Sequence, residues 1–250
     1  WTALGLVPDT VIRAGIRRLL ESKRKEIHSG DVEFAATTMN RFVDMMNESP
    51  IALVPELANE QHYEVPAEFF THVMGDNLKY SCCYWPQDVS NLSEAEAAAL
   101  EITVERAGIE DGMNVLDLGC GWGSLSLWIA EHFPNASVTS LSNSTKQHDF
   151  ILRQAADSSI QNINVILCDM NYFEIYESFD RVVSVEMFEH MRNYGELFRR
   201  INGWLVPDGK FFMHIFCHKT TPYEYIDKGP GDWMSRFFFT GGIMPGADLP

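Results

Sequence analysis

Glu186, Glu189 and His190 stand in the segment VEMFEHMRNY at a spacing that could serve proton transfer. Positions i, i+3 and i+4 share one side of a helical turn, so these side chains would converge if the chain turns helically there. Two carboxylates and an imidazole can take a proton from a nucleophile and stabilise a cationic product. Two other interpretations stay open: a structural salt-bridge cluster, and iron binding as in carboxylate bundles. Iron is disfavoured because no second helix with acidic and histidine ligands accompanies this one.

A turn rich in glycine forms a second candidate site. Gly119, Gly121 and Gly123 follow the apolar run NVLDL and precede an amphipathic run. Because glycine has no Cβ, the backbone of such a turn can pass close to a ligand, and ligands of open α/β sheets bind beyond the carboxyl ends of the strands. Asp117, just before the turn, would repel a pyrophosphate but attract a cationic group or accept a hydrogen bond. A purely structural turn, with Asp117 capping backbone NH groups, is the alternative.

The elements that must position these groups follow from hydrophobic periodicity. From Gly112 onward, apolar runs alternate with amphipathic segments. This alternation predicts an α/β fold with a mostly parallel sheet and helices on both faces. The expected strands are 113–119, 136–142, 162–169, 179–187 and 210–216, and the expected helices between them are 123–133, 145–157 and 193–205.

The part before residue 108 is expected to be helical. Its predicted helices cover 7–27, 32–47, 67–75 and 93–107, and in the last of them Ser93 and Glu96 stand at capping-box spacing. In the second helix a buried apolar stripe is expected, made of Phe34, Met39, Phe42, Val43 and Met46. The chain therefore divides into a helical cap at 1–107 and an α/β domain at 108–250, with a substrate lid expected to be incomplete at Pro250.

Composition excludes several kinds of partner. The chain has 35 acidic residues against 19 Lys and Arg, a formal net charge of −16. This balance opposes nucleic-acid binding, which needs a cationic surface, and weakens docking on an anionic membrane. No apolar run approaches the ~20 residues of a spanning helix. The five cysteines form no CxxC pair, so we expect reduced thiols in a cytoplasmic protein. The vicinal Cys82 and Cys83 could indicate redox or metal chemistry, but buried small side chains are the favoured interpretation. The oligomeric state stays open, a homodimer included.

The segment LDLGCGWG resembles motif I of the class I methyltransferases that depend on S-adenosyl-L-methionine. The resemblance implies a Rossmann-like fold with the cofactor at Asp117, Gly119 and Gly121. The next strand ends in SNSTKQ instead of an acidic residue, as in the branch that contains cyclopropane-fatty-acid synthases, mycolic-acid methyltransferases and coclaurine N-methyltransferases. In that branch this run contacts the ribose. The further cofactor contacts that the resemblance implies are Asn143, Gln147, Asp169, Met170 and Asn171.

The resemblance to this branch extends upstream. The segment QHYEVPAEFF and the later YSCCYW are similar to the branch's N-terminal hallmark, a His-Tyr pair followed by Y-S-C-x-Y-F. In the family this stretch closes over the methionine end of the cofactor. It implies Tyr80 and Ser81 as cofactor contacts here, with Trp85 where phenylalanine is usual.

The run EMFEHMRNY is similar to the coclaurine N-methyltransferases, whereas cyclopropane synthases usually have a small residue at the place of Glu186. This resemblance implies N-methylation of a small cyclic or aromatic amine. Glu186 and Glu189 would be amine ligands or acid–base groups and His190 the general base. The alternatives left open are methylene transfer to an unsaturated acyl chain, with bicarbonate or Glu189 taking the proton, and a non-catalytic cofactor-binding module.

The segment after the last predicted strand would complete the substrate pocket. His214 and Tyr223 are expected to line it, and further aromatic side chains could hold an aromatic amine by stacking or cation–π contact: Tyr225, Trp233, Phe237, Phe238 and Phe239. Zinc binding by the H-x-x-C-H run that begins at His214 is not expected, because a fourth ligand at finger spacing is missing. No metal is therefore predicted.

Overall fold

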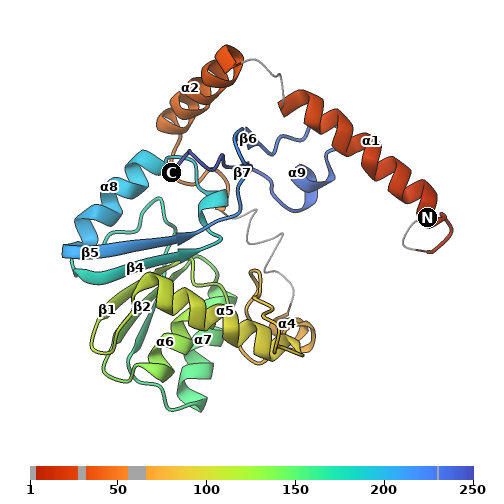
Figure 1. Ribbon diagram of the computed structural model, residues 1–250. Coiled ribbons are helices and arrows are strands. Elements are labelled where there is room, and N and C mark those ends of the chain that lie inside the picture. Colours follow the sequence, from red (N-terminus) through yellow and green to blue (C-terminus); the bar gives the residue numbers. More distant parts are fainter. Residues whose placement is uncertain (1–3, 28–31, 56–65, 230) are drawn as a thin grey trace.

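The computed structural model describes residues 4–27, 32–55, 66–229 and 231–250. Its centre is a five-stranded parallel sheet in the order β3-β2-β1-β4-β5 (Figure 1). The strands are β1 (Asn114–Leu118), β2 (Ser137–Ser142), β3 (Ile163–Leu167), β4 (Phe179–Val185) and β5 (Leu205–His214). All five predicted strands form, and the α/β prediction is confirmed.

Helices cover both faces of the sheet (Figure 1). Alternate residues of each strand face opposite sides: Val115 and Val183 pack against one layer of helices, Leu116 and Val182 against the other. The first layer holds α5 (Leu92–Ala107), α6 (Ser124–His132) and α7 (Thr145–Asp157), and α8 (Tyr194–Trp204) packs on the second face. Both faces of the sheet are therefore buried, as parallel sheets require.

The start of α6 depends on a close approach that only glycine permits. Gly123 caps the helix in the left-handed region, at φ 83°. A Cβ on Gly123 would lie 2.6 Å from Cγ1 of Ile151 in α7. The turn after β1 is therefore held directly against the neighbouring helix, which fixes the floor of the site described below.

The beginning of α5 differs from the predicted capping box. The helix starts at Leu92, and the side chain of Asn91 caps it by accepting from the Glu94 amide at 3.0 Å. The capping-box prediction for Ser93 and Glu96 is wrong, because both side chains serve another segment.

The fully buried Glu96 carboxylate instead accepts from the amides of Gly75 and Asn77 at 2.8 and 2.9 Å. The Ser93 hydroxyl accepts from the amide of Asp76. Together they anchor the segment that leads into Lys79 and Tyr80, so this predicted cap acts as a support for one wall of the site.

The N-terminal helices are α1 (Asp9–Ile27), α2 (Val32–Glu48) and α4 (Ala67–Val73). In the predicted stripe of α2, Phe42 and Met46 are buried in the core shared with α8, while Val43 is exposed. The side chain of Phe34 lies outside the described residues, as do His62 and Tyr63 of the predicted hallmark. Helix α1 extends away from the sheet (Figure 1), and its Leu19 and Leu20 are exposed.

The division at residues 107 and 108 stays a prediction, but α5 lies before it and packs in the core of the sheet through Leu100 and Val104. Beyond the sheet, β6 (Tyr223–Glu224) pairs antiparallel with β7 (Ile243–Met244), and the short α9 (Trp233–Phe237) lies between them in the chain. Within the described ranges, none of the helices combines the length and apolar character needed to cross a membrane.

Candidate active site

Two cavities meet at the carboxyl ends of β1 and β4. Both are bordered by the same four residues, Gly119, Gly121, Glu186 and His190. The first cavity continues toward the ends of β2 and β3, and the second, of about 350 Å³, continues toward the segment 78–81 and the start of α6. The site therefore has two chambers with a shared junction, and the predicted glycine turn and acid–base residues lie together at that junction.

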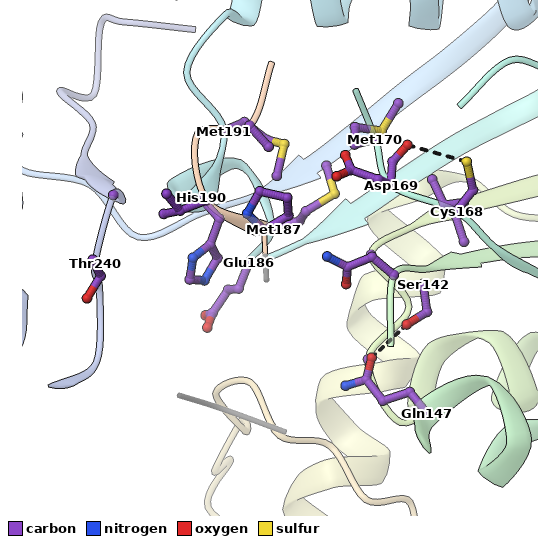
Figure 2. A pocket seen from close by; sticks show the side chains of 18 residues that line it. Ser142, Gln147, Cys168, Asp169, Met170, Glu186, Met187, His190, Met191 and Thr240 are labelled. Atoms are coloured by element: carbon purple, nitrogen blue, oxygen red, sulfur yellow. Dashed lines mark hydrogen bonds between the residues drawn. The ribbon is translucent and has the colours of Figure 1, made fainter. Parts of the chain in front are cut away.

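The first cavity has a buried amide that offers a hydrogen bond. Gln147 is 2% exposed, and its Oε1 accepts from the Ser142 hydroxyl at 2.8 Å. Among the described residues its Nε2 finds no partner. Figure 2 shows Gln147 and Asp169 on one side of this cavity, opposite Glu186 and His190. A buried donor beside a carboxylate suits the hydroxyl groups of a ribose.

Of the other predicted contacts in this chamber, Asn143 and Met170 border it. Asn171 has a different role, because its side chain accepts from the amide of Ala52 and donates to the carbonyl of Ala52, both at 3.0 Å. Ala52 itself borders the cavity. Asn171 therefore fixes one wall of the chamber from behind, a long-range role that the sequence did not indicate.

The glycines at the junction serve two purposes. Gly119, at φ 76°, lies under Met187, because a Cβ there would come within 2.8 Å of the Met187 Cγ. Gly121 has φ 56°, and no described atom lies within 4 Å of the position of its missing Cβ. Gly119 thus lets the turn after β1 pack directly against the turn after β4, while Gly121 leaves its backbone open to a ligand.

Asp117 borders the second cavity while being only 2% exposed. Its Oδ2 accepts from the Ser126 hydroxyl at 2.6 Å, which in turn accepts from Ser140. Burial raises the pKa of Asp117 to about 6, and the Ser126 hydrogen bond opposes this. A cationic group in the cavity would compensate the buried charge, as the ammonium of an amino-acid tail would.

Lys79 is a site residue that sequence reasoning missed. It is 6% exposed, borders the second cavity with Tyr80 and Ser81, and donates to the Ser81 hydroxyl at 2.6 Å and the Cys82 carbonyl at 2.7 Å. Burial lowers its pKa, against the raising effect of nearby acidic groups. The chamber thus offers a cation and, at Asp117, an anion. This pair complements the carboxylate and ammonium of the methionine end of the expected cofactor, so the residues present fit that group.

Glu186 begins the turn after β4 in an unusual backbone conformation. Its φ is 53°, in the left-handed region, and its amide donates to the His214 carbonyl at 2.8 Å. Glu186 and His190 both border the two cavities, and Figure 2 shows their side chains on the same side of the first one. The His190 ring stacks on Phe239, with centroids 5.1 Å apart. The two residues thus border the same junction, and their role in proton transfer stays a prediction.

Glu189 turns away from this pair. It is fully buried, and its Oε1 accepts from the Phe216 amide at 2.7 Å, while Oε2 has no partner among the described residues. Burial raises its pKa to about 7. The predicted spacing requires one α-helical turn from Glu186, but Glu186 is left-handed and residues 188–190 form a 3₁₀ turn. Glu189 therefore supports the wall that holds Phe216, and a direct catalytic role for it stays a prediction.

Of the residues predicted to contact the substrate, some border the second cavity and others do not. Phe238 and Phe239 border the second cavity together with Phe216, whereas Trp233 and Phe237 are more than half exposed. Tyr223 lies under the Lys23 ammonium, 4.3 Å from its ring centroid. His214 faces Cys82 at the end of β5, with Nε2 and Sγ 3.9 Å apart.

The expectation of buried thiols is wrong, because Cys82 is exposed and Cys83 is partly exposed.

The doubly covered parallel sheet, the glycine turn and the two-chambered site define a class I methyltransferase that depends on S-adenosylmethionine. Residues 55–249 match the family described as mycolic acid cyclopropane synthetase, and the chain belongs to this family.

Several relatives of the chain are plant N-methyltransferases. (S)-Coclaurine N-methyltransferase of Thalictrum flavum subsp. glaucum is 39% identical over 96% of this chain and 67% of its own length. A crystal structure of coclaurine N-methyltransferase bound to N-methylheliamine and SAH matches with a TM-score of 0.91 and 38% identity, over 98% of this chain and 72% of that one. Cyclopropane-fatty-acyl-phospholipid synthase of Escherichia coli K12 is 31% identical over 76% of this chain and 47% of its own length.

The buried charge of Asp117 leads to a first prediction. We expect Asp117→Asn to weaken binding of SAH by about 10- to 100-fold, because a charge-assisted hydrogen bond is lost. The unfolding free energy of the ligand-free protein should not fall, since the amide avoids burying a charge. Calorimetric titration and urea unfolding measure the two quantities. Asp180→Asn is the control, because Asp180 accepts from the Asn114 amide at the opposite edge of the sheet. Unchanged affinity in Asp117→Asn would contradict the assignment.

A second prediction concerns Glu189. Its folded pKa of about 7 lies above its ordinary 4.5, so the folded protein keeps a proton that the unfolded chain releases. The unfolding free energy should therefore fall as pH rises between these values, by on the order of 3 kcal/mol.

Glu189→Gln should remove this part of the pH dependence while keeping an acceptor for the Phe216 amide. Urea unfolding at about pH 5 and about pH 8 measures it. Glu177→Gln, at an exposed loop position, is the matched control and should show the same change of unfolding free energy with pH as the parent protein. If the unfolding free energy of Glu189→Gln changed with pH as that of the parent does, Glu189 would be ionised in the folded protein without an energetic penalty.

Proposed function

We propose that this chain transfers the methyl group of S-adenosylmethionine to the nitrogen of a small cyclic or aromatic amine. The observation that supports this most is the Glu186 carboxylate at the junction of the two cavities, which His190 also borders. One chamber suits the adenosine part of the cofactor, and the other has polar groups for its methionine end. An amine near Glu186 would lie where these two chambers meet.

The comparisons support this choice of substrate class. The coclaurine N-methyltransferase relatives cover nearly all of this chain at 36–39% identity, whereas the bacterial cyclopropane synthase matches a smaller share. The crystal structure of coclaurine N-methyltransferase, a protein of the same fold, contains N-methylheliamine together with SAH. Both facts favour an amine over an acyl chain.

The chemistry needs an activated methyl group from the cofactor and two contributions from the protein. When bound, the cofactor supplies an electrophilic methyl group on a sulfonium. The amine must lose its proton before it can attack, and it must lie in line with the methyl group. Glu186 would attract the ammonium form and orient its nitrogen, and His190, which borders the same junction, would take the proton. Because the stack with Phe239 fixes the plane of the His190 ring, the proton acceptor is held in one orientation.

An aromatic wall would hold the rest of the amine. Phe216, Phe238 and Phe239 border the second cavity, and Phe216 and Phe239 meet edge to face with centroids 5.4 Å apart. Such faces bind apolar rings and stabilise a cation by about 0.5–2 kcal/mol. The product carries more positive charge at nitrogen than the neutral amine, so the wall and Glu186 would both favour the transition state over the free amine.

The net charge of −16 supports a small-molecule substrate and no nucleic-acid partner. The cytoplasmic location stays a prediction, as does the direct cofactor contact of Tyr80 and Ser81, and the oligomeric state stays open.

Replacement of Glu186 tests the proposal. Glu186→Gln keeps the size of the side chain but removes its charge, and we expect kcat/KM for amine methylation to fall by about 10²- to 10⁴-fold. Binding of SAH should change far less, because Asp117, Lys79 and Gln147 are untouched. Turnover of labelled cofactor and calorimetry give the two values, and equal losses in both would make Glu186 a structural residue.

The substrate class is tested by offering labelled S-adenosylmethionine with a panel of tetrahydroisoquinolines and, separately, with phospholipid vesicles that hold unsaturated chains. Label should appear in the amines. Label only in the lipid would contradict the proposal in favour of methylene transfer. Binding of the cofactor without turnover on either substrate would instead favour a binding module.

A further inference from the structure

Three side chains with metal-ligating atoms gather at the outer edge of the junction. Sγ of Cys82, a carboxylate oxygen of Glu186 and a ring nitrogen of His214 all lie within 4.8 Å of one another. They come from three places in the chain: the segment after Lys79, the end of β4 and the end of β5. Neither the family match nor the relatives' names assign a metal to such a set. The sequence pattern does not reveal it, because His214 is close in the chain to Cys217 and His218 but distant from Cys82.

The distance between the sulfur of Cys82 and the ring nitrogen of His214 is close to that between two ligands of one transition metal. Zinc binds sulfur at about 2.3 Å and nitrogen at about 2.05 Å, which places two tetrahedral ligands about 3.6 Å apart. Nε2 of His214 and Sγ of Cys82 are 3.9 Å apart. A shift of a few tenths of an ångström would bring these two atoms to that spacing, and the Glu186 oxygen lies within 4.8 Å of both. Cys82 is exposed, so an ion can enter. Three protein ligands leave the fourth position for water, as in open zinc sites.

The surrounding charges select the kind of ion. The Lys79 ammonium, held by the Ser81 hydroxyl and the Cys82 carbonyl, places a positive charge nearby and opposes any cation. The Glu186 carboxylate is the one acidic side chain of the set, and the Lys79 charge opposes its attraction for a cation. Electrostatic attraction alone therefore holds a cation only weakly. A hard ion such as Mg²⁺ would gain little here, whereas an ion that bonds strongly to thiolate and imidazole would overcome the repulsion.

We propose that Cys82, Glu186 and His214 form a binding site for Zn²⁺ or a similar thiophilic divalent cation. Binding releases the Cys82 thiol proton to the buffer and forms bonds from the metal to sulfur, to the His214 ring and to one Glu186 oxygen. Occupancy takes the Glu186 carboxylate away from the amine, so the ion acts as a reversible inhibitor. The inhibition rests on the proposed function, but the binding does not.

Cobalt is the direct probe of this site. Titration of the metal-free protein with Co²⁺ should give ligand-field bands of low coordination number and a sulfur-to-metal charge-transfer band. Added Zn²⁺ should abolish both, and Mg²⁺ should not. Cys82→Ser should weaken Co²⁺ binding by more than about 100-fold, since the loss of a ligand exceeds the effect of losing its outer partners. Glu186→Gln and His214→Ala should also weaken it.

Two neighbouring thiols provide matched controls. Cys83→Ser changes the adjacent thiol, and Cys217→Ser changes an exposed thiol next to His218. Both variants should keep the charge-transfer band. Absence of the band in the parent protein, or its loss in Cys217→Ser with retention in Cys82→Ser, would overturn the site.

Inhibition is measured separately on amine methylation. Zn²⁺ should inhibit the parent protein, a chelator should restore its activity, and Cys82→Ser should be resistant relative to its own metal-free rate. If cobalt binds but methylation is insensitive to Zn²⁺, the inhibitory role is wrong while the site stands. If no amine is methylated at all, the proposed function fails, and the cobalt spectra still decide the metal site.

Discussion

The arrangement of the site depends on how the chain leaves β4. Glu186 is in the left-handed region, a conformation that costs a residue with a side chain roughly 1–2 kcal/mol. It persists because β4 is held between β1 and β5 and because the Glu186 amide continues the bonding pattern onto the His214 carbonyl. The left-handed conformation of Glu186 brings its carboxylate to the junction of both cavities. It also lays Met187 over Gly119, so that the turns after β1 and β4 fit together.

Buried charges around this turn show a conflict between stability and binding. Asp117, Lys79 and Glu189 are all largely buried. Burial raises the pKa of the two carboxyl groups and lowers the pKa of the lysine, so in each case it favours the neutral form. Such groups weaken the folded state unless a ligand of the opposite charge arrives. Asp117 and Lys79 border a cavity and are available to a zwitterion, whereas Glu189 faces the Phe216 amide and helps to hold the wall. A ligand with both charges should therefore stabilise this protein strongly.

Much of this could be predicted from local patterns. The strands follow from periodicity, and the glycine turn with Asp117 follows from a motif within a few residues. Gln147 is implied by the resemblance to the family, and the structure places it at the first cavity, which the glycine turn also borders. What could not be predicted depends on contacts between distant segments. Glu96 supports a segment about 20 residues upstream, and Asn171 holds Ala52 across more than 100 residues. The orientation of Glu189 depends on one left-handed residue, which no spacing rule contains. Lys79 looks like a surface residue in the sequence, because its burial arises only when the segment folds over the cavity.

The proposed function requires the Glu186 carboxylate to receive the amine at the junction of the two cavities. A crystal structure of the chain with SAH and a tetrahydroisoquinoline tests it most directly. We predict the amine nitrogen at hydrogen-bond distance from a Glu186 oxygen, about 2.7–3.0 Å, with the ring against the aromatic wall. An amine bound with its nitrogen beyond about 4 Å from Glu186, or an acyl chain as the preferred occupant of the same chamber, would contradict it.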